Sequence, residues 1–187
     1  MIHSVRFTCV LDTNVIYPIY IRDILFWFAI YDLFTIKWSK HIFEEWIRLM
    51  KSKGFTDVKA KRIADRANQV FPNAMVENYE NLIDSLALKD VQDNHVLAAA
   101  IKTNANLIVT NNLKDFPKEY LESFGLNAKN ADDFLSDIID LNPETAVMAF
   151  RELVMNKRKP DLDEYQVLDI LRNNGLKDSA DYLHAML

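Results

Sequence analysis

Acidic side chains follow two apolar runs of this chain, and both runs have the length of a buried strand. In "TCVLDTNVIYP", residues 8–18, Asp12 comes directly after the apolar segment. In "LIVTNNLKDFP", residues 107–117, Asp115 follows the second run, and Asp93 opens the helix that leads into it. Ligands bind at the carboxyl ends of the strands in a parallel sheet, so these acids could share one site. Carboxylates held close together repel one another by about 4 kcal/mol per pair at an effective dielectric constant of about 20, so a shared site would need a cation.

A structural explanation accounts for the same residues without any chemistry. Asp90 or Asp93 can cap the N-terminus of a helix, and Asp12 can form the turn that ends a strand. The spacing does not force Asp93 to the same edge of the sheet as Asp12, because a whole helix separates it from its strand. From spacing alone, the structural explanation is the simpler one.

The elements that must position these acids alternate between apolar runs and amphipathic helices, which predicts an α/β fold with a parallel sheet. We expect strands at residues 5–12, 34–38 and 107–110. We expect helices at residues 22–33, from Ser39 to Gly54, at 57–70 and from Asp93 onward. Beyond residue 130 the patterns are helical throughout. We therefore divide the chain into an α/β body, residues 1–130, and a helical C-terminal extension packed on it, residues 131–187.

Composition indicates a globular protein of the cytoplasm. Half of the 187 residues are hydrophobic, and Cys9 is the single cysteine, which excludes an internal disulfide. No window approaches the roughly 18 apolar residues of a membrane span, and the N-terminus does not have the pattern of a signal peptide. The net charge of −5 argues mildly against broad affinity for nucleic acid. The segment at residues 51–66 is nevertheless basic.

Three segments, taken in order and spacing, resemble the motifs of the PIN-domain nucleases. These are "VLDTNVIYP", "WSKHIFEEWIRLM" and "DVQDNHVLAAAIKTNANLIVTNNLKDFP". The last is similar to the branch of that family related to VapC-type toxins, and the resemblance covers roughly residues 6–135. It implies a PIN-like parallel sheet flanked by helices. It also implies a Mg²⁺- or Mn²⁺-dependent endoribonuclease that acts as the toxin of a toxin–antitoxin pair.

The resemblance also assigns site residues. It implies four metal-binding acids that are also the catalytic residues: Asp12, Glu45, Asp93 and Asp115. It implies four polar residues that support them: Thr13, Asn14, Thr110 and Asn112. Many family members carry an acid where this chain has Asn112, so Asp115 is left to supply the fourth charge. Hard oxygen ligands favour Mg²⁺ or Mn²⁺ over zinc, and a bound metal would activate water for attack on a phosphodiester.

Periodicity does not choose between Glu44 and Glu45, because the two side chains flank the apolar face of their helix at similar angles. Only the resemblance favours Glu45. His95 is explained more simply as a structural residue than as a catalytic one. Four basic residues are candidates for RNA contact, with an ordinary surface role as the alternative: Arg22, Lys59, Lys61 and Arg62.

Two other functions remain open at this point. One is a catalytically idle PIN module that binds RNA or protein, and the other is an RNA-processing nuclease without an antitoxin. Retention of all four acids favours an enzyme over the idle module. The expected partners are an RNA substrate, an antitoxin encoded by an adjacent gene and a second copy of the chain, with no membrane.

Overall fold

A computed structural model describes residues 7–157 and 160–187, which form two compact units. The first unit contains residues 7–17 and 35–129. The second contains residues 18–34 together with the described residues from 130 onward. Each unit is discontinuous in sequence, because residues 18–34 group with the C-terminal helices. The division into domains at residue 130 therefore stays a prediction.

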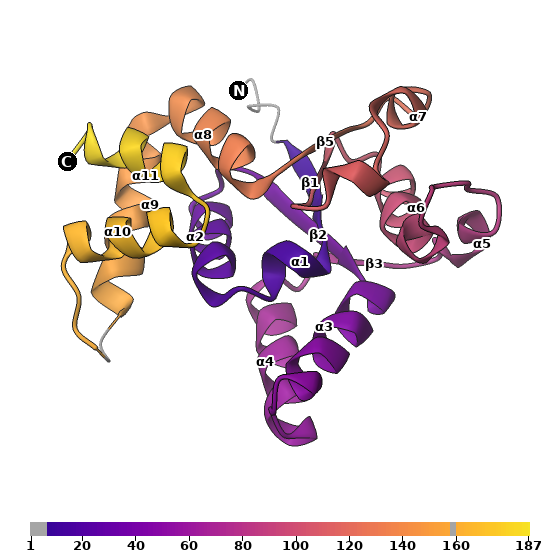
Figure 1. Cartoon of the computed structure of the whole chain (residues 1–187), viewed down its shortest axis with the longest axis horizontal. Helices are drawn as coiled ribbons and strands as arrows, with labels where there is room; N and C mark the ends of the chain where they lie inside the picture. The colour runs from indigo at the N-terminus through magenta and orange to yellow at the C-terminus, as the bar shows by residue number, and fades with distance from the viewer. Residues whose placement is uncertain (1–6, 158–159) are drawn as a thin grey trace. The chain divides into compact units, whose positions relative to one another are not determined.

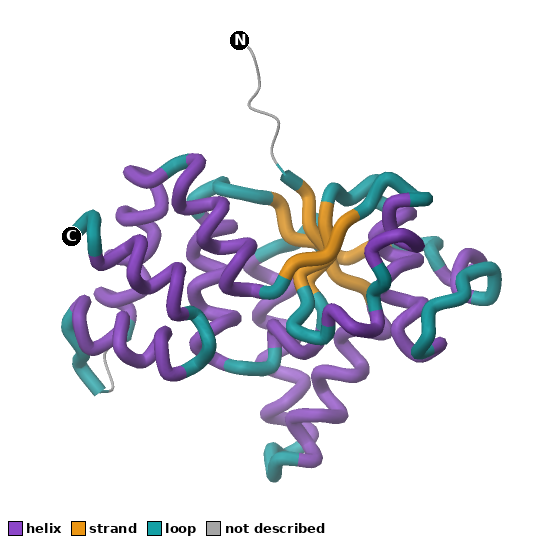
Figure 2. The backbone as a smooth tube through the Cα atoms, turned by 45° about the horizontal axis from the view of Figure 1, so that its top comes forward, coloured by secondary structure: helices purple, strands orange, loops and turns teal. Residues whose placement is uncertain are grey.

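A five-stranded, fully parallel sheet forms the centre of the first unit, as predicted (Figure 1, Figure 2). The strand order is β3-β2-β1-β4-β5. The strands are β1 (Thr8–Leu11), β2 (Thr35–Ser39), β3 (Met75–Val76), β4 (Leu107–Val109) and β5 (Asn127–Lys129). Cys9, Val10 and Leu11 of the central strand β1 are apolar and fully buried, as is typical of a parallel sheet. Leu11 at the end of β1 pairs with Val109 at the end of β4, so both strands end at the same edge.

Helices join the strands of this unit and carry the residues of interest to that edge. They are α1 (Thr13–Ile16), α3 (Lys40–Ser52), α4 (Asp57–Val70), α5 (Glu80–Ile83), α6 (Asn94–Lys102) and α7 (Lys118–Glu122). Two short 3₁₀ turns, η1 (Val91–Asp93) and η2 (Leu113–Asp115), precede α6 and follow β4. The predicted cap at Ser39 is confirmed, since its hydroxyl accepts a hydrogen bond from the Ile42 N–H at 3.3 Å. Figure 1 shows α3 and α4 lying side by side as a hairpin.

The second unit is helical, as predicted for the C-terminal part of the chain. It consists of α2 (Ile19–Ile30), α8 (Ala131–Leu141), α9 (Pro143–Asn156), α10 (Glu164–Asn173) and α11 (Lys177–His184). Helix α2 packs against α9, and α11 packs against both α8 and α10. Phe28 of α2 and Phe150 of α9 are fully buried, as the apolar faces of these helices require. None of the helices formed by the described residues has the length and apolarity of a membrane span.

Candidate functional site

Asp12 lies at the junction of β1 and α1, where it is 5% exposed. Its Oδ1 accepts a hydrogen bond from the Thr13 backbone N–H at 2.6 Å, so it caps α1. Its Oδ2 accepts hydrogen bonds from the Thr110 hydroxyl at 2.7 Å and from the Asn14 amide at 2.5 Å. Thr110 follows β4 directly, so the two neighbouring strand ends are joined through this carboxylate.

The polar residues around Asp12 form a connected network. The Asn14 amide donates to the Thr110 hydroxyl at 2.9 Å, and its carbonyl oxygen accepts from the Asn111 N–H at 2.8 Å. The Asn112 N–H also donates to the Thr110 hydroxyl, at 3.1 Å. Every member therefore has a fixed orientation, and the network holds the Asp12 carboxylate in one place.

Glu45 projects from α3 toward the same strand end. The Thr13 hydroxyl donates to its Oε2 at 2.9 Å, and His95 Nε2 lies 3.2 Å from its Oε1. The neighbouring Glu44 is half-exposed and lies 3.7 Å from the Lys40 ammonium. The structure thus brings Glu45, and not Glu44, into contact with the residues beside Asp12.

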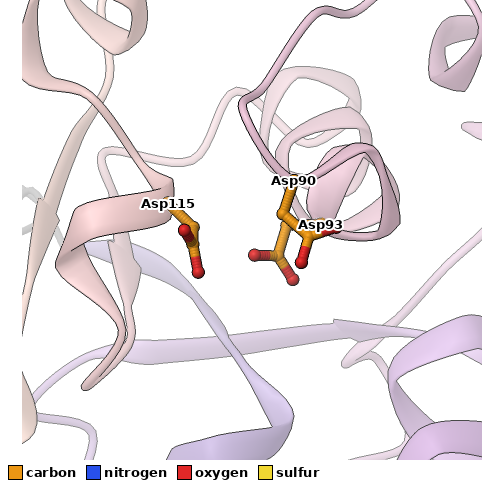
Figure 3. A group of neighbouring side chains, drawn as sticks. All are labelled: Asp90, Asp93 and Asp115. Carbon is orange, nitrogen blue, oxygen red and sulfur yellow. The ribbon is translucent and has the colours of Figure 1, made fainter.

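Three further carboxylates gather where η1 and η2 face each other (Figure 3). Asp90, Asp93 and Asp115 each offer an oxygen, and these oxygens lie within 4.8 Å of one another. Asp90 accepts from the Gln92 N–H at 2.9 Å, so it is Asp90 that caps the turn before α6. Within the described chain, Asp93 makes no capping hydrogen bond, and its Oδ2 is buried without a hydrogen-bond partner. The carboxylate of Asp93 is therefore available to a ligand.

The electrostatics join this group to Asp12 and Glu45. Burial, and after it the nearby charges of Asp12, Asp90, Asp115 and Glu45 in that order, together raise the pKa of Asp93 to about 7. Each of these acids thus disfavours the ionised form of Asp93. The five carboxylates form one electrostatically coupled group, in which Arg48, 3.8 Å from Oε1 of Glu45, is a neighbouring positive charge.

Asp12 and Glu45 respond to burial differently. Burial raises the pKa of Asp12, and the hydrogen bonds from Thr110 and Thr13 offset only part of that effect. Burial would also raise the pKa of Glu45, but the hydrogen bonds and charges of its neighbours, chiefly His95 and then Thr13, lower it below the ordinary value. Glu45 is thereby held as an anion at the entrance to the group.

Comparison with known proteins identifies the first unit. The sequence model of the PIN domain matches residues 8–114, more than half of the chain. The chain belongs to the PIN domain family. A second family, the VapC50 C-terminal domain, matches residues 131–185. The PIN match includes Asp12, Glu45, Asp90 and Asp93, whereas Asp115 lies one residue beyond it.

One curated relative supports the same assignment. A protein of Mycobacterium tuberculosis (strain ATCC 25618 / H37Rv) named "Putative ribonuclease VapC50" is 36% identical over 98 residues. The aligned part is 52% of this chain and 57% of that relative, so the chain spans little more than half of its length. No solved structure matches the chain.

The residues of the PIN domain fit a hard divalent cation. The side chains nearest the coupled acids offer carboxylate, hydroxyl and amide oxygens, which are the ligands that Mg²⁺ and Mn²⁺ prefer. The unpartnered Oδ2 of Asp93 and its raised pKa both indicate negative charge that a cation would neutralise. The Asn112 amide donates to the Asp115 carboxylate and orients it, so Asn112 supports this acid without adding a charge.

The predicted RNA-contact residues belong to α4 and α2, which carry none of these acids. Lys59, Lys61 and Arg62 are exposed on α4, where Lys61 pairs with Asp57 at 2.9 Å. Arg22 belongs to the helical unit, and its side chain is only 15% exposed beside Asp23, at 3.6 Å.

Sequence reasoning missed two residues of the PIN domain site. Asp90 was considered only as a helix cap, although its position three residues before Asp93 places both acids on one 3₁₀ turn. His95 was considered structural, and its contact with Glu45 joins segments that are far apart in the sequence. The spacing of Asp90 was a usable signal, whereas the partner of His95 could come only from the fold.

Proposed function

We propose that the protein is a Mg²⁺- or Mn²⁺-dependent endoribonuclease that hydrolyses RNA phosphodiester bonds. The observation that carries the proposal is the coupled group of five carboxylates, in which Asp93 has a pKa of about 7 and an unpartnered buried oxygen. Membership of the PIN domain family and the name of the mycobacterial relative support RNA as the substrate.

The residues proposed to hold the metal are Asp12, Glu45, Asp93 and Asp115, with Asp90 as an additional ligand beside Asp93. When bound, a divalent cation supplies an activated water and stabilises the negative oxygens of the phosphodiester. The chain's own contribution is orientation, which raises the rate because reacting groups are held in place in advance.

Three of these acids, Asp12, Glu45 and Asp115, have orienting partners. Thr110 and Asn14 fix the carboxylate of Asp12, and Thr13 fixes that of Glu45. Asn112 fixes Asp115. The proposed roles of these polar residues are thus positional, and none of them needs to transfer a proton.

Helix α4 and the loop before it are proposed to attract the RNA backbone. Residues 51–70 contain six Lys or Arg and two Asp, although the whole chain has a net charge of −5. Lys59, Lys61 and Arg62 are exposed on α4, where they can contact phosphates and steer RNA toward the acids. Arg22 is left out because its guanidinium is largely buried beside Asp23.

We further propose that the protein is a cytoplasmic, VapC-type toxin whose activity is neutralised by an antitoxin. The two family matches and the mycobacterial relative support this proposal. Induced expression in a bacterial host should arrest growth, and co-expression of the adjacent gene should restore it. An active wild-type protein that leaves growth unaffected would argue for the processing nuclease instead.

The substrate class is tested by direct competition. Labelled single-stranded RNA and plasmid DNA are incubated with the protein and Mn²⁺, and the products of both are resolved from one reaction. We expect the RNA to be cut at internal positions and the plasmid to remain intact. Nicking of the plasmid with intact RNA would contradict the proposed substrate.

A further inference from the structure

His95 is a buried histidine whose polar contact joins two helices of the PIN domain. It lies in the first turn of α6, its side chain is 8% exposed, and its Nε2 is 3.2 Å from Oε1 of Glu45 on α3. This is the distance of an ion pair, but the geometry does not make a hydrogen bond between the two atoms. Among the described residues, the Nδ1 atom of the ring has no hydrogen-bond partner. The contact with Glu45 is therefore the ring's main polar interaction.

The surroundings of His95 fix the position of its ring. The His41 ring stacks on it, with 5.3 Å between ring centroids and 27° between ring planes. His41 is itself held by the hydroxyl of the fully buried Tyr79, 2.5 Å from its Nδ1. The preceding residue, Asn94, accepts from the Leu88 N–H at 3.1 Å and so anchors the start of α6. Neither the ring nor its backbone can move away from Glu45 without breaking one of these contacts.

The carboxylate of Glu45 is thereby contacted at both of its oxygens. The Thr13 hydroxyl binds Oε2, and His95 lies against Oε1. The charge of Glu45 in turn acts on Asp12 and Asp93. The orientation of Glu45 relative to the other acids therefore depends on a hydroxyl donor from α1 and on the His95 ring from α6, with Arg48 of α3 3.8 Å from the same Oε1.

We infer that His95 is a positioning residue that holds Glu45 in the orientation required for metal binding. The role needs only a proton on Nε2, which the neutral ring supplies as well as the charged one. In that tautomer Nδ1 carries a lone pair and no N–H. The inference rests on the proposed metal site, because it gives Glu45 its function as a ligand.

The test is a double-mutant cycle on Mn²⁺ affinity, measured by electron paramagnetic resonance on the full chain. His95→Leu removes the donor and keeps an apolar side chain of similar bulk. Loss of a residue that orients a metal ligand typically weakens metal binding by about 10–100-fold, and we expect that range here. His95→Gln returns an N–H close to the position of Nε2, so it should recover most of the affinity.

The second arm of the cycle separates positioning from a general structural role. In a Glu45→Gln background, His95→Leu should change the Mn²⁺ affinity by no more than about twofold, since residues that act through one another are not additive. Glu44→Gln serves as the matched control on α3 and should bind Mn²⁺ like the wild type. If His95→Leu does not fold, His95→Asn takes its place, because its shorter amide cannot reach Oε1.

The possible outcomes distinguish the positioning role of His95 from the proposed metal site on which it rests. A wild-type chain that binds Mn²⁺ no better than Asp12→Asn would overturn the proposed metal site. A wild-type chain that binds Mn²⁺ normally, with His95→Leu unchanged, would overturn the role of His95 alone. Equal losses from His95→Leu in the wild-type and Glu45→Gln backgrounds would also overturn it, because His95 would then act independently of Glu45.

Discussion

Replacing Asp93 by Asn should stabilise the metal-free protein at pH 8, and the gain should shrink as the pH falls. The pKa of Asp93 is raised from 3.8 to about 7, first by burial and then by the neighbouring acids. Between these pH values the folded chain holds a proton that the unfolded chain releases. The stability of metal-free wild type therefore falls as the pH rises from about 4 to about 7, and the cost is fully present above pH 7.

The size of the effect follows from the same two pKa values. If the whole difference between the folded and unfolded pKa values of Asp93 acted on stability, it would lower the free energy of unfolding by about 4 kcal/mol. Asp93 is only half-buried, so solvent screening reduces the expected gain from Asp93→Asn to roughly 1–2 kcal/mol at pH 8. For a chain of this length that gain corresponds to a rise in melting temperature of roughly 2–8 °C.

Urea unfolding in excess EDTA, followed by circular dichroism at pH 5 to 8, measures the effect. Asp140→Asn, which changes an exposed aspartate of α8, is the matched control and should alter stability little at any pH. The reasoning is refuted if Asp93→Asn is no more stable than wild type at pH 8. It is equally refuted if the gain does not decrease toward pH 5.

Three other predictions test separate parts of the structure. Adding Mn²⁺ should raise the melting temperature of wild type and of Glu44→Gln but not of Glu45→Gln, measured by differential scanning fluorimetry. If Glu45→Gln responds and Glu44→Gln does not, the metal ligand is Glu44 and not Glu45. Replacing Lys59 and Arg62 together by Gln should raise KM for RNA and leave kcat unchanged. It should also reduce the slope of log Kd against log salt concentration by about 1.4. An unchanged KM and an unchanged slope would show that these residues make no phosphate contacts. Asp132→Ala should destabilise the chain by about 1–2 kcal/mol in urea, because this carboxylate accepts two backbone N–H groups at the start of α11, at 2.9 and 2.8 Å.

Elements with strong local patterns could be predicted from the sequence. The helix at residues 57–70 has the predicted bounds, and the apolar centre of β1 identified a strand of a parallel sheet. Helix α2 begins at Ile19 rather than Arg22, because Pro18 occupies the N-cap and a helix can start directly after it.

Short elements without a period could not be predicted. Helix α1 has four residues, which is barely one turn, so an amphipathic pattern cannot develop. Strand β5, Asn127–Lys129, lies at the edge of the sheet and carries two polar residues, which resembles a loop. Strand β5 forms because it pairs with β4, and α1 forms where the chain leaves β1. Such tertiary contacts are not visible in the local sequence.

The geometry of the site was predictable where it follows from the sheet topology and not where it depends on contacts between distant segments. Strand ends place Asp12 and Thr110 together, and the parallel pairing of β1 and β4 makes this a consequence of topology. Periodicity could not separate Glu44 from Glu45, because the contacts that distinguish them come from Thr13 on α1 and His95 on α6, which are distant in sequence. Either Asp90 or Asp93 could cap this helix from the sequence, and the cap is Asp90, because a 3₁₀ turn precedes α6.

The most direct test of the proposed activity is the cleavage of total RNA by purified protein, with Mg²⁺ or Mn²⁺ and in excess EDTA, followed by mapping of the RNA ends. The account predicts defined internal cuts with metal, none in EDTA, and none with folded Asp12→Asn or Asp93→Asn under any condition. Full cleavage by the wild type in EDTA, or cleavage by either variant at the wild-type rate, would contradict it.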